Sequence, residues 1–117
     1  MFLGSAVTYS NGAKVSMLGV SEDTLASHGA VSTETAREMA QGAVRAFSSD
    51  VSVAVTGIAG PGGAVPGKPV GTVCIAVSDG CRTIVSRFVF DGDRDAVRAS
   101  TVAEAISMLH DMVEGIL

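Results

Sequence analysis

The sequence predicts an α/β fold: a single three-layer domain in which a mixed β-sheet is flanked by helices. Three observations support this class. The 117 residues suffice for one small domain. Segments with apolar residues at helical spacing alternate with short β-branched runs in the order β-α-α-β-β-β-α. The pair Asp79-Gly80 lies between two of these runs and predicts a hairpin with a type I′ turn.

The first half of the chain predicts one strand, two helices and a short turn between the helices. Residues 3–9 are small or β-branched and predict a short strand. Asn11 is the expected N-cap of a brief helix through residues 14–18, and Ser21 can cap a further short turn over residues 22–26. Ser32 is the expected cap of a longer helix, whose apolar stripe is Ala36, Met39, Ala40, Ala43, Val44 and Phe47.

The second half predicts three strands and one helix. The strands are residues 51–55, 70–77 and 83–90, and a glycine-rich loop, residues 56–67, joins the first two. Asp93 is the expected cap of the last helix, whose stripe is Val97, Thr101, Ala105, Met108, Leu109, Met112, Val113 and Ile116.

The beginning of the chain predicts an incomplete fold. The sequence opens inside a predicted strand, and the predicted helices are too few to cover both faces of a sheet. We therefore expect a stretch in front of residue 1 that adds a strand and a helix to the domain.

Composition argues against several classes of function. The formal net charge is −4 and the eight basic residues are scattered, so we expect no binding of nucleic acid. No apolar run approaches the ~20 residues of a membrane span, and the first residues lack the pattern of a signal peptide. We expect a cytoplasmic protein. Cys74 and Cys81 flank the predicted turn at positions too far apart for a disulfide, and we expect both to be reduced.

No metal or other cofactor is expected. His28 and His110 have no companion histidine, cysteine or paired carboxylate at ligand spacing. Asp91, Asp93 and Asp95 lie close together, but without further oxygen ligands they indicate charge at a helix start.

Three segments carry more potential binding groups than folding alone requires: residues 8–14, residues 56–63, and residues 68–72 together with residues 91–94. Residues 8–14 form a strand-to-helix junction, where unpaired backbone N–H groups bind anions, although a capped helix with a solvent lysine explains them too. Residues 56–63 form a glycine loop at a strand exit, where backbone amides can surround a phosphate or an oxyanion. An irregular surface loop is the alternative.

The glycine loop fails two nucleotide motifs. Gly62 to Lys68 matches the G-x-x-x-x-G-K part of a phosphate-binding loop, but Pro69 replaces its magnesium-binding hydroxyl residue. The dinucleotide fingerprint fails because Val65 stands where a third glycine or alanine belongs. Lys68 and Arg94 could hold a phosphate near the loop, or they could be ordinary surface residues.

Taken together, these segments resemble the CinA C-terminal domain family, the nicotinamide-nucleotide amidases. The similarity runs from about Phe2 to the end of the chain, in register and without large gaps. The matching motifs are Tyr9-Ser10-Asn11-x-x-Lys14, Leu18-Gly19-Val20, His28-Gly29-Ala30-Val31-Ser32, Ala54-Val55-Thr56-Gly57-Ile58-Ala59-Gly60-Pro61-Gly62-Gly63, Lys68-Pro69-Val70-Gly71-Thr72-Val73 and Gly92-Asp93-Arg94.

The resemblance implies a reaction and a set of residues. The family hydrolyses the carboxamide of nicotinamide mononucleotide to nicotinate mononucleotide and ammonia without a metal, using a serine in an S-C-T-G-G motif that a lysine activates. It implies catalytic roles for Lys14, Tyr9 and Thr56. We assign substrate binding to Ser10, Asn11, Gly57, Gly60, Lys68, Gly71 and Arg94.

The sequence departs from this family in one respect. It contains no S-C-T-G-G motif, so residues 1–117 are expected to be a CinA C-terminal-like domain without the N-terminal part that carries the serine. Three explanations stay open: an incomplete amidase, a non-catalytic paralogue that binds nucleotide or pairs with another subunit, and an enzyme using Ser10 or Thr56 as the nucleophile. Because part of the sheet would be uncovered, we expect a homo-oligomer.

Overall fold

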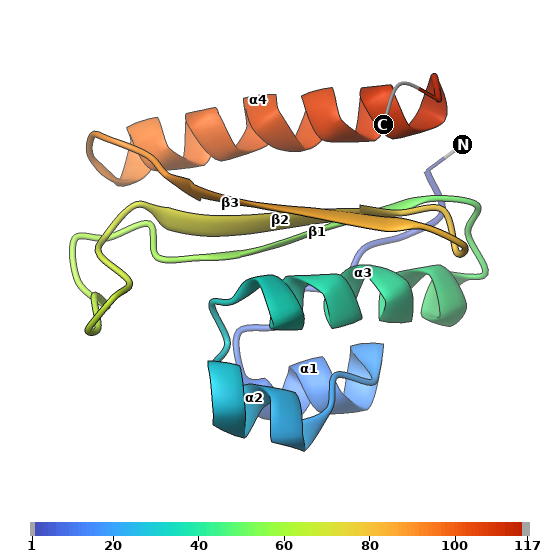
Figure 1. The fold of residues 1–117 in the computed structure, drawn as a ribbon, viewed down its shortest axis with the longest axis horizontal. Coiled ribbons are helices and arrows are strands. Elements are labelled where there is room, and N and C mark those ends of the chain that lie inside the picture. The colour runs from blue at the N-terminus through green and yellow to red at the C-terminus, as the bar shows by residue number, and fades with distance from the viewer. Residues whose placement is uncertain (1, 116–117) are drawn as a thin grey trace.

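The computed structural model describes residues 2–115, and its elements form layers around one β-sheet (Figure 1). Helix α4, Arg94–Val113, covers one face of the sheet, and helix α3, Thr33–Phe47, covers the other. Two short helices, α1 (Asn11–Leu18) and α2 (Glu22–His28), pack on the outside of α3. This arrangement confirms the predicted three-layer α/β class.

Serine side chains begin the first three helices. Ser21 and Ser32 cap α2 and α3, and Ser32 does so as predicted. The cap of α1 is Ser10, whose hydroxyl oxygen accepts the N–H of Ala13 at 3.0 Å, so the prediction of Asn11 as N-cap was wrong. Ser10 has the extended backbone that lets a capping oxygen reach the third helical residue, whereas Asn11 is already in the helix.

The sheet has three strands in the order β1 (Ser52–Gly57), β2 (Thr72–Ser78) and β3 (Thr83–Val89). Both pairs of strands are antiparallel, with Val55 opposite Ile75 and Ile75 opposite Ser86. The prediction of a mixed sheet was therefore wrong for the part of the chain that the structure describes.

The prediction of a strand at residues 3–9 was also wrong. This segment forms no regular secondary structure, and most of its residues are exposed. It passes along the β1 side of the sheet toward α1, and residues 2–6 form one wall of a cleft whose other wall is residues 49–55 (Figure 1). A strand requires backbone hydrogen bonds to a neighbouring strand, and residues 3–9 make none with any other part of residues 2–115.

The hairpin between β2 and β3 differs from the predicted type I′ turn. Its connection is residues 79–82, closed by the N–H of Asp79 donating to the carbonyl of Arg82 at 3.1 Å. A type I′ turn requires positive φ at both central residues, but of Asp79 and Gly80 only Gly80 has it. The Asp79 carboxylate instead accepts the N–H groups of Cys81 and Arg82, and this side-chain cap determines the turn.

Helix α4 and the sheet share an apolar core. Val97, Met108 and Met112 of the predicted stripe are buried against β2, with Ala105 and Leu109 partly buried beside them. Val113 is exposed, contrary to prediction, and Ile116 lies outside the described residues. A second core joins α1 and α3 to the other face of β1 and β2. None of the helices described in residues 2–115 is both long and apolar enough to cross a membrane.

Candidate functional site

Several candidate residues meet at one end of the sheet. The glycine-rich loop between β1 and β2, the connection between α2 and α3, and the first turn of α4 all lie there (Figure 1). Thr56 at the end of β1 donates its hydroxyl to the carbonyl of Ala30 at 2.7 Å. Lys68 of the loop donates its ammonium to the carbonyl of His28 at 2.6 Å. Two predicted site residues therefore hold the same short segment, residues 28–30.

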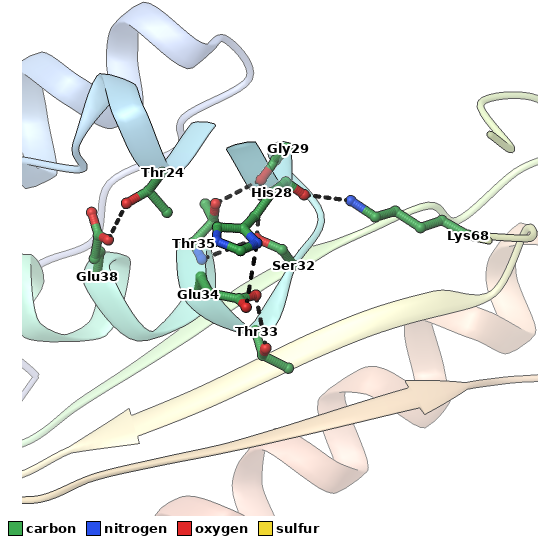
Figure 2. Close-up of polar contacts among 9 residues, drawn as sticks. All are labelled: Thr24, His28, Gly29, Ser32, Thr33, Glu34, Thr35, Glu38 and Lys68. Atoms are coloured by element: carbon green, nitrogen blue, oxygen red, sulfur yellow. Dashed lines mark hydrogen bonds and ion pairs between the residues drawn. The ribbon is translucent and has the colours of Figure 1, made fainter. Parts of the chain in front are cut away.

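The carbonyl of Gly29, between these two, is held by α3. Thr35 Oγ1 donates to it at 2.7 Å and Ser32 Oγ at 3.0 Å (Figure 2). Gly29 has a φ of +82°, and a Cβ there would stand 3.0 Å from the Lys68 ammonium. Glycine thus lets the lysine approach this backbone. Side chains from three different elements fix the carbonyls of His28, Gly29 and Ala30.

An acidic side chain lies beside this segment. Glu34 Oε2 is 3.4 Å from His28 Nδ1, and Thr33 Oγ1 donates to the other oxygen at 3.0 Å (Figure 2). The pKa of Glu34 is lowered chiefly by its own backbone N–H, then by the Thr33 hydroxyl, and further by His28 and Lys68. In the next turn, Thr24 donates to Glu38 and so joins α2 to α3.

Lys14 is a buried lysine in α1. It is 7% exposed, and its Nζ donates to the carbonyl of Thr8 at 2.6 Å. Burial disfavours the charged form and lowers the pKa of Lys14 below its ordinary value. Among residues 2–115 no hydrogen bond joins Lys14 to the Ser10 hydroxyl: the ammonium donates to Thr8, and Ser10 Oγ accepts the N–H of Ala13.

The other predicted residues of this segment are solvent-facing. Tyr9 is 94% exposed, and Ser10 and Asn11 are exposed as well. Tyr9 is near Lys14 in the sequence, but among the described residues no hydrogen bond joins the two side chains.

The glycines assigned to substrate binding have clear structural roles. Gly71 is buried with a φ of +97°, and a Cβ there would lie 2.1 Å from the carbonyl oxygen of Phe90. Gly60 also has positive φ, and its carbonyl accepts a bond from Arg94 Nη1 at 3.3 Å. Arg94 therefore ties the start of α4 to the glycine loop.

The candidate residues fall into three groups. Thr56 and Lys68 meet at residues 28–30, Gly60 meets Arg94, and Lys14 lies against Thr8. No hydrogen bond among residues 2–115 joins Lys14 to the other two groups.

Of the predicted residues, Gly57 lines a cavity of about 290 Å³ between β1 and α4. The described residues contain no group of three or more His, Cys, Asp or Glu side chains that could hold a metal ion.

Sequence reasoning missed Thr35 and the carbonyls of residues 28–30 as parts of this site. One signal was available for Thr35, because the Ser32 cap bonds the N–H of the residue three positions later. The sequence could not predict which carbonyls belong to the site, because every residue carries a backbone carbonyl.

Comparison with known proteins identifies similar chains. The family model of the CinA C-terminal domain matches residues 1–113. A CinA-like protein of Citrifermentans bemidjiense is 54% identical over 92% of this chain and 26% of its own length. A putative competence-damage inducible protein of Symbiobacterium thermophilum is 47% identical over 95% of this chain and 28% of its own length.

Solved structures of CinA-related proteins have the same fold as this chain. The competence damage-inducible protein A of Klebsiella pneumoniae superposes with a TM-score of 0.86 at 37% identity, over 92% of this chain and 66% of its own. The competence/damage inducible protein CihA of Agrobacterium tumefaciens gives 0.83 at 44% identity, over 87% and 63%. The chain thus spans about a quarter of the curated relatives cited here and less than two thirds of the solved CihA chain.

Proposed function

Because the chain belongs to the CinA C-terminal domain family, we propose that it supplies the lysine part of a nicotinamide-nucleotide amidase site. The reaction is hydrolysis of the carboxamide of nicotinamide mononucleotide to nicotinate mononucleotide and ammonia. In this proposal Lys14 is the general base, the nucleophilic serine lies outside residues 1–117, and the protein acts in the cytoplasm. The observation that carries the proposal is the burial of Lys14.

A lysine can accept a proton from a serine only when its amine is neutral at the working pH. Removal from water is the main way to achieve this, and burial lowers the pKa of Lys14. Its bond to the Thr8 carbonyl fixes the amine and uses one N–H donor, which leaves the nitrogen lone pair free once a proton has been lost. The serine Oγ would then add to the carboxamide carbon as its proton passes to Lys14, and Lys14 would return that proton to the carboxamide nitrogen, which leaves as ammonia. Water would then hydrolyse the acyl-serine, giving nicotinate mononucleotide and the free serine.

The glycine loop is the proposed place for the rest of the nucleotide. Backbone amides around Gly57 and Gly60 would donate to the oxyanion or the phosphate, as such loops do elsewhere. Lys68 and Arg94 already lie at this end of the sheet, each bonded to a backbone carbonyl. We propose that they exchange these carbonyls for phosphate oxygens when the nucleotide binds.

The second candidate function is a non-catalytic nucleotide-binding or subunit-pairing paralogue. Substitute nucleophiles are disfavoured. The Ser10 hydroxyl is held by its helix cap, and the Thr56 hydroxyl donates to Ala30, so neither is hydrogen-bonded to a lysine.

Ammonia release and thermal shift on the purified chain test the proposal. With nicotinamide mononucleotide we expect no turnover and a melting temperature that rises with ligand concentration. Nicotinamide riboside, which lacks the phosphate, is the control and should give a smaller rise. Ammonia release that survives repeated purification would contradict a nucleophile outside these residues. A melting temperature that does not respond to the mononucleotide would contradict the binding site itself.

A further inference from the structure

Arg87 of β3 lies on the face of the sheet that carries the candidate site. It stands opposite Cys74 of β2, which in turn stands opposite Thr56 of β1. Side chains of directly opposite residues point to the same face, so these three form one row across the sheet. Thr56 in this row donates to the carbonyl of Ala30. Arg87 therefore lies on the same side of the sheet as residues 28–30, although the proposed function gives it no role.

Arg87 holds a tight turn in the glycine-rich loop. Its Nη2 donates to the carbonyl of Gly67 at 2.7 Å. Gly67 belongs to a turn in which the backbones of Val65 and Lys68 exchange two hydrogen bonds, of 3.1 and 2.9 Å. It follows Pro66 and has a φ of +79°, as the third residue of a type II turn requires. Because the turn is closed by its own bonds, a bond to Gly67 also fixes the backbone of Lys68.

Lys68 ties the same turn to the end of α2. Its Nζ donates to the carbonyl of His28 at 2.6 Å (Figure 2). Burial raises the pKa of the Cys74 thiol, and the positive charges of Arg87 and Lys68 both oppose that rise, so both charged groups lie around this one thiol. The turn is thus held by two charge-assisted bonds, one from β3 to its Gly67 carbonyl and one from its own lysine to α2.

We propose that Arg87 is a positioning residue for Lys68: its bond to Gly67 holds the turn at residues 65–68 where the lysine ammonium reaches residues 28–30 and an anionic ligand. A lysine has a flexible four-carbon stem, so the place of its ammonium depends on the backbone that carries it. Without the Gly67 bond the turn keeps its internal bonds but loses its tie to β3. The Lys68 ammonium then spends less time at the carbonyl of His28. The part that concerns the ligand rests on the proposed function, whereas the coupling between Arg87 and Lys68 does not.

A purely structural role for Arg87 makes a different prediction. Strand β3 is an outer strand of the described sheet, and a charge on such a strand discourages pairing with other sheets. That role depends on the charge alone and leaves the surroundings of Lys68 unchanged when Arg87 is replaced. The positioning role depends on a donor that reaches the Gly67 carbonyl. The accessibility of the Lys68 amine to a reagent therefore distinguishes the two roles.

Trace acetylation of the purified chain, resolved by site with mass spectrometry, tests the coupling. The chain has two lysines, Lys14 and Lys68, so the buried Lys14 is an internal reference. Arg87→Gln should raise the acetylation rate of Lys68 at least about threefold, because a charge-assisted bond no longer holds the turn, and should leave Lys14 unchanged. Arg37→Gln is the matched control. Arg37 also donates to a backbone carbonyl, that of Thr83 at 3.0 Å, but at the end of β3 away from the loop.

Two further variants and a binding measurement complete the test. Arg87→Lys keeps a charged donor and should restore most of the wild-type rate at Lys68. Arg87→Met, which keeps the apolar stem, repeats the test should Arg87→Gln fail to fold. By calorimetry, Arg87→Gln should raise the dissociation constant of nicotinamide mononucleotide about 3–10-fold and leave that of nicotinamide riboside, which has no phosphate, unchanged. A wild type that does not bind the mononucleotide contradicts the proposed function, and the acetylation rates still decide whether Arg87 positions Lys68.

Three acetylation results would overturn the positioning role. An unchanged rate at Lys68 in Arg87→Gln would leave Arg87 with its charge on β3 alone. A rise at Lys14 and Lys68 together would indicate a general loosening of the fold, and an equal rise in Arg37→Gln would show that the effect does not depend on the bond to Gly67. In a wild type that binds the mononucleotide, an affinity that Arg87→Gln leaves unchanged, or lowers equally for the riboside, would overturn the part that concerns the ligand.

Discussion

The two faces of the sheet are formed by the same strands but differ in the side chains that they bury. Toward α4, β2 presents Val73, Ile75 and Val77 to an entirely apolar core. Toward α3, the neighbouring positions of β1 and β2 are smaller or polar, among them Thr56 and Cys74. The polar bonds to residues 28–30 and the buried Lys14 belong to the α3 side. The alternation of side chains along a strand thus separates stability on one face from chemistry on the other.

Burial on the two faces also has different consequences. On the α4 face it removes apolar side chains from water and stabilises the fold. On the α3 face it changes the chemistry of single groups: it lowers the pKa of Lys14 and raises the pKa of the Cys74 thiol. The three predictions below test this contrast, beginning with the largest effect.

Ile75→Ala tests the apolar face. The side chain is fully buried in β2, and its removal should lower the free energy of unfolding by about 3–4 kcal/mol through lost burial and a residual cavity. Urea denaturation measures the change, and Val89→Ala, at an exposed position of β3, should change stability by less than about 0.5 kcal/mol. A loss below about 1 kcal/mol for Ile75→Ala would show that the α4 face is not tightly packed.

Gly42→Ala tests how closely α1 packs on α3. A Cβ at Gly42 would stand 1.7 Å from the carbonyl oxygen of Leu18, so the two helices would have to separate. We expect a loss of about 2–3 kcal/mol by denaturation, whereas glycine-to-alanine in an unobstructed helix is stabilising. Gly62→Ala is the control, because a Cβ there would meet no atom within 4 Å. A stabilised Gly42→Ala protein would contradict the close approach.

Lys14→Met tests the effect of burial on the candidate base. The pKa of Lys14 is lower in the folded chain than in the unfolded chain, so unfolding takes up a proton between that value and about 10.4. The free energy of unfolding of the wild type should therefore rise with pH across this window, relative to Lys14→Met. Urea denaturation at a series of pH values measures this gain.

Lys68→Met is the matched variant for this measurement. Lys68 also donates a 2.6 Å bond to a backbone carbonyl, but from a partly exposed position. Identical pH profiles for the wild type and Lys14→Met would show that burial does not act on Lys14, and would remove the main support for its role as a base.

Much of the fold could be predicted from the sequence because its signals are local. The Ser32 and Asp93 caps, the stripe of α3 and the β2–β3 hairpin each depend on residues close together in the chain. The predictions were wrong where two neighbouring residues could both cap a helix, and where a predicted strand needed a second strand to pair with. Ser10 and Asn11 are both good capping residues, and only the backbone geometry decides between them.

The candidate site was predicted less completely. The resemblance pointed to Lys14, but the sequence could not show that its side chain is buried or that its ammonium donates to Thr8. Charge suggested that Lys68 and Arg94 bind phosphate, yet in this structure each ties the loop region to a carbonyl of a distant residue. Such contacts join residues 34 and 40 positions apart, and no short motif encodes them.

The sequence by itself determined the α/β class, the order of the main helices and the family resemblance, because periodicity, caps and motifs act over a few residues. The tertiary structure decided which predicted strands are paired, since residues 3–9 are β-forming in composition but pair with no strand among residues 2–115. It also decided which lysine is buried. Pairing and burial depend on groups far apart in the chain, and these meet only after folding.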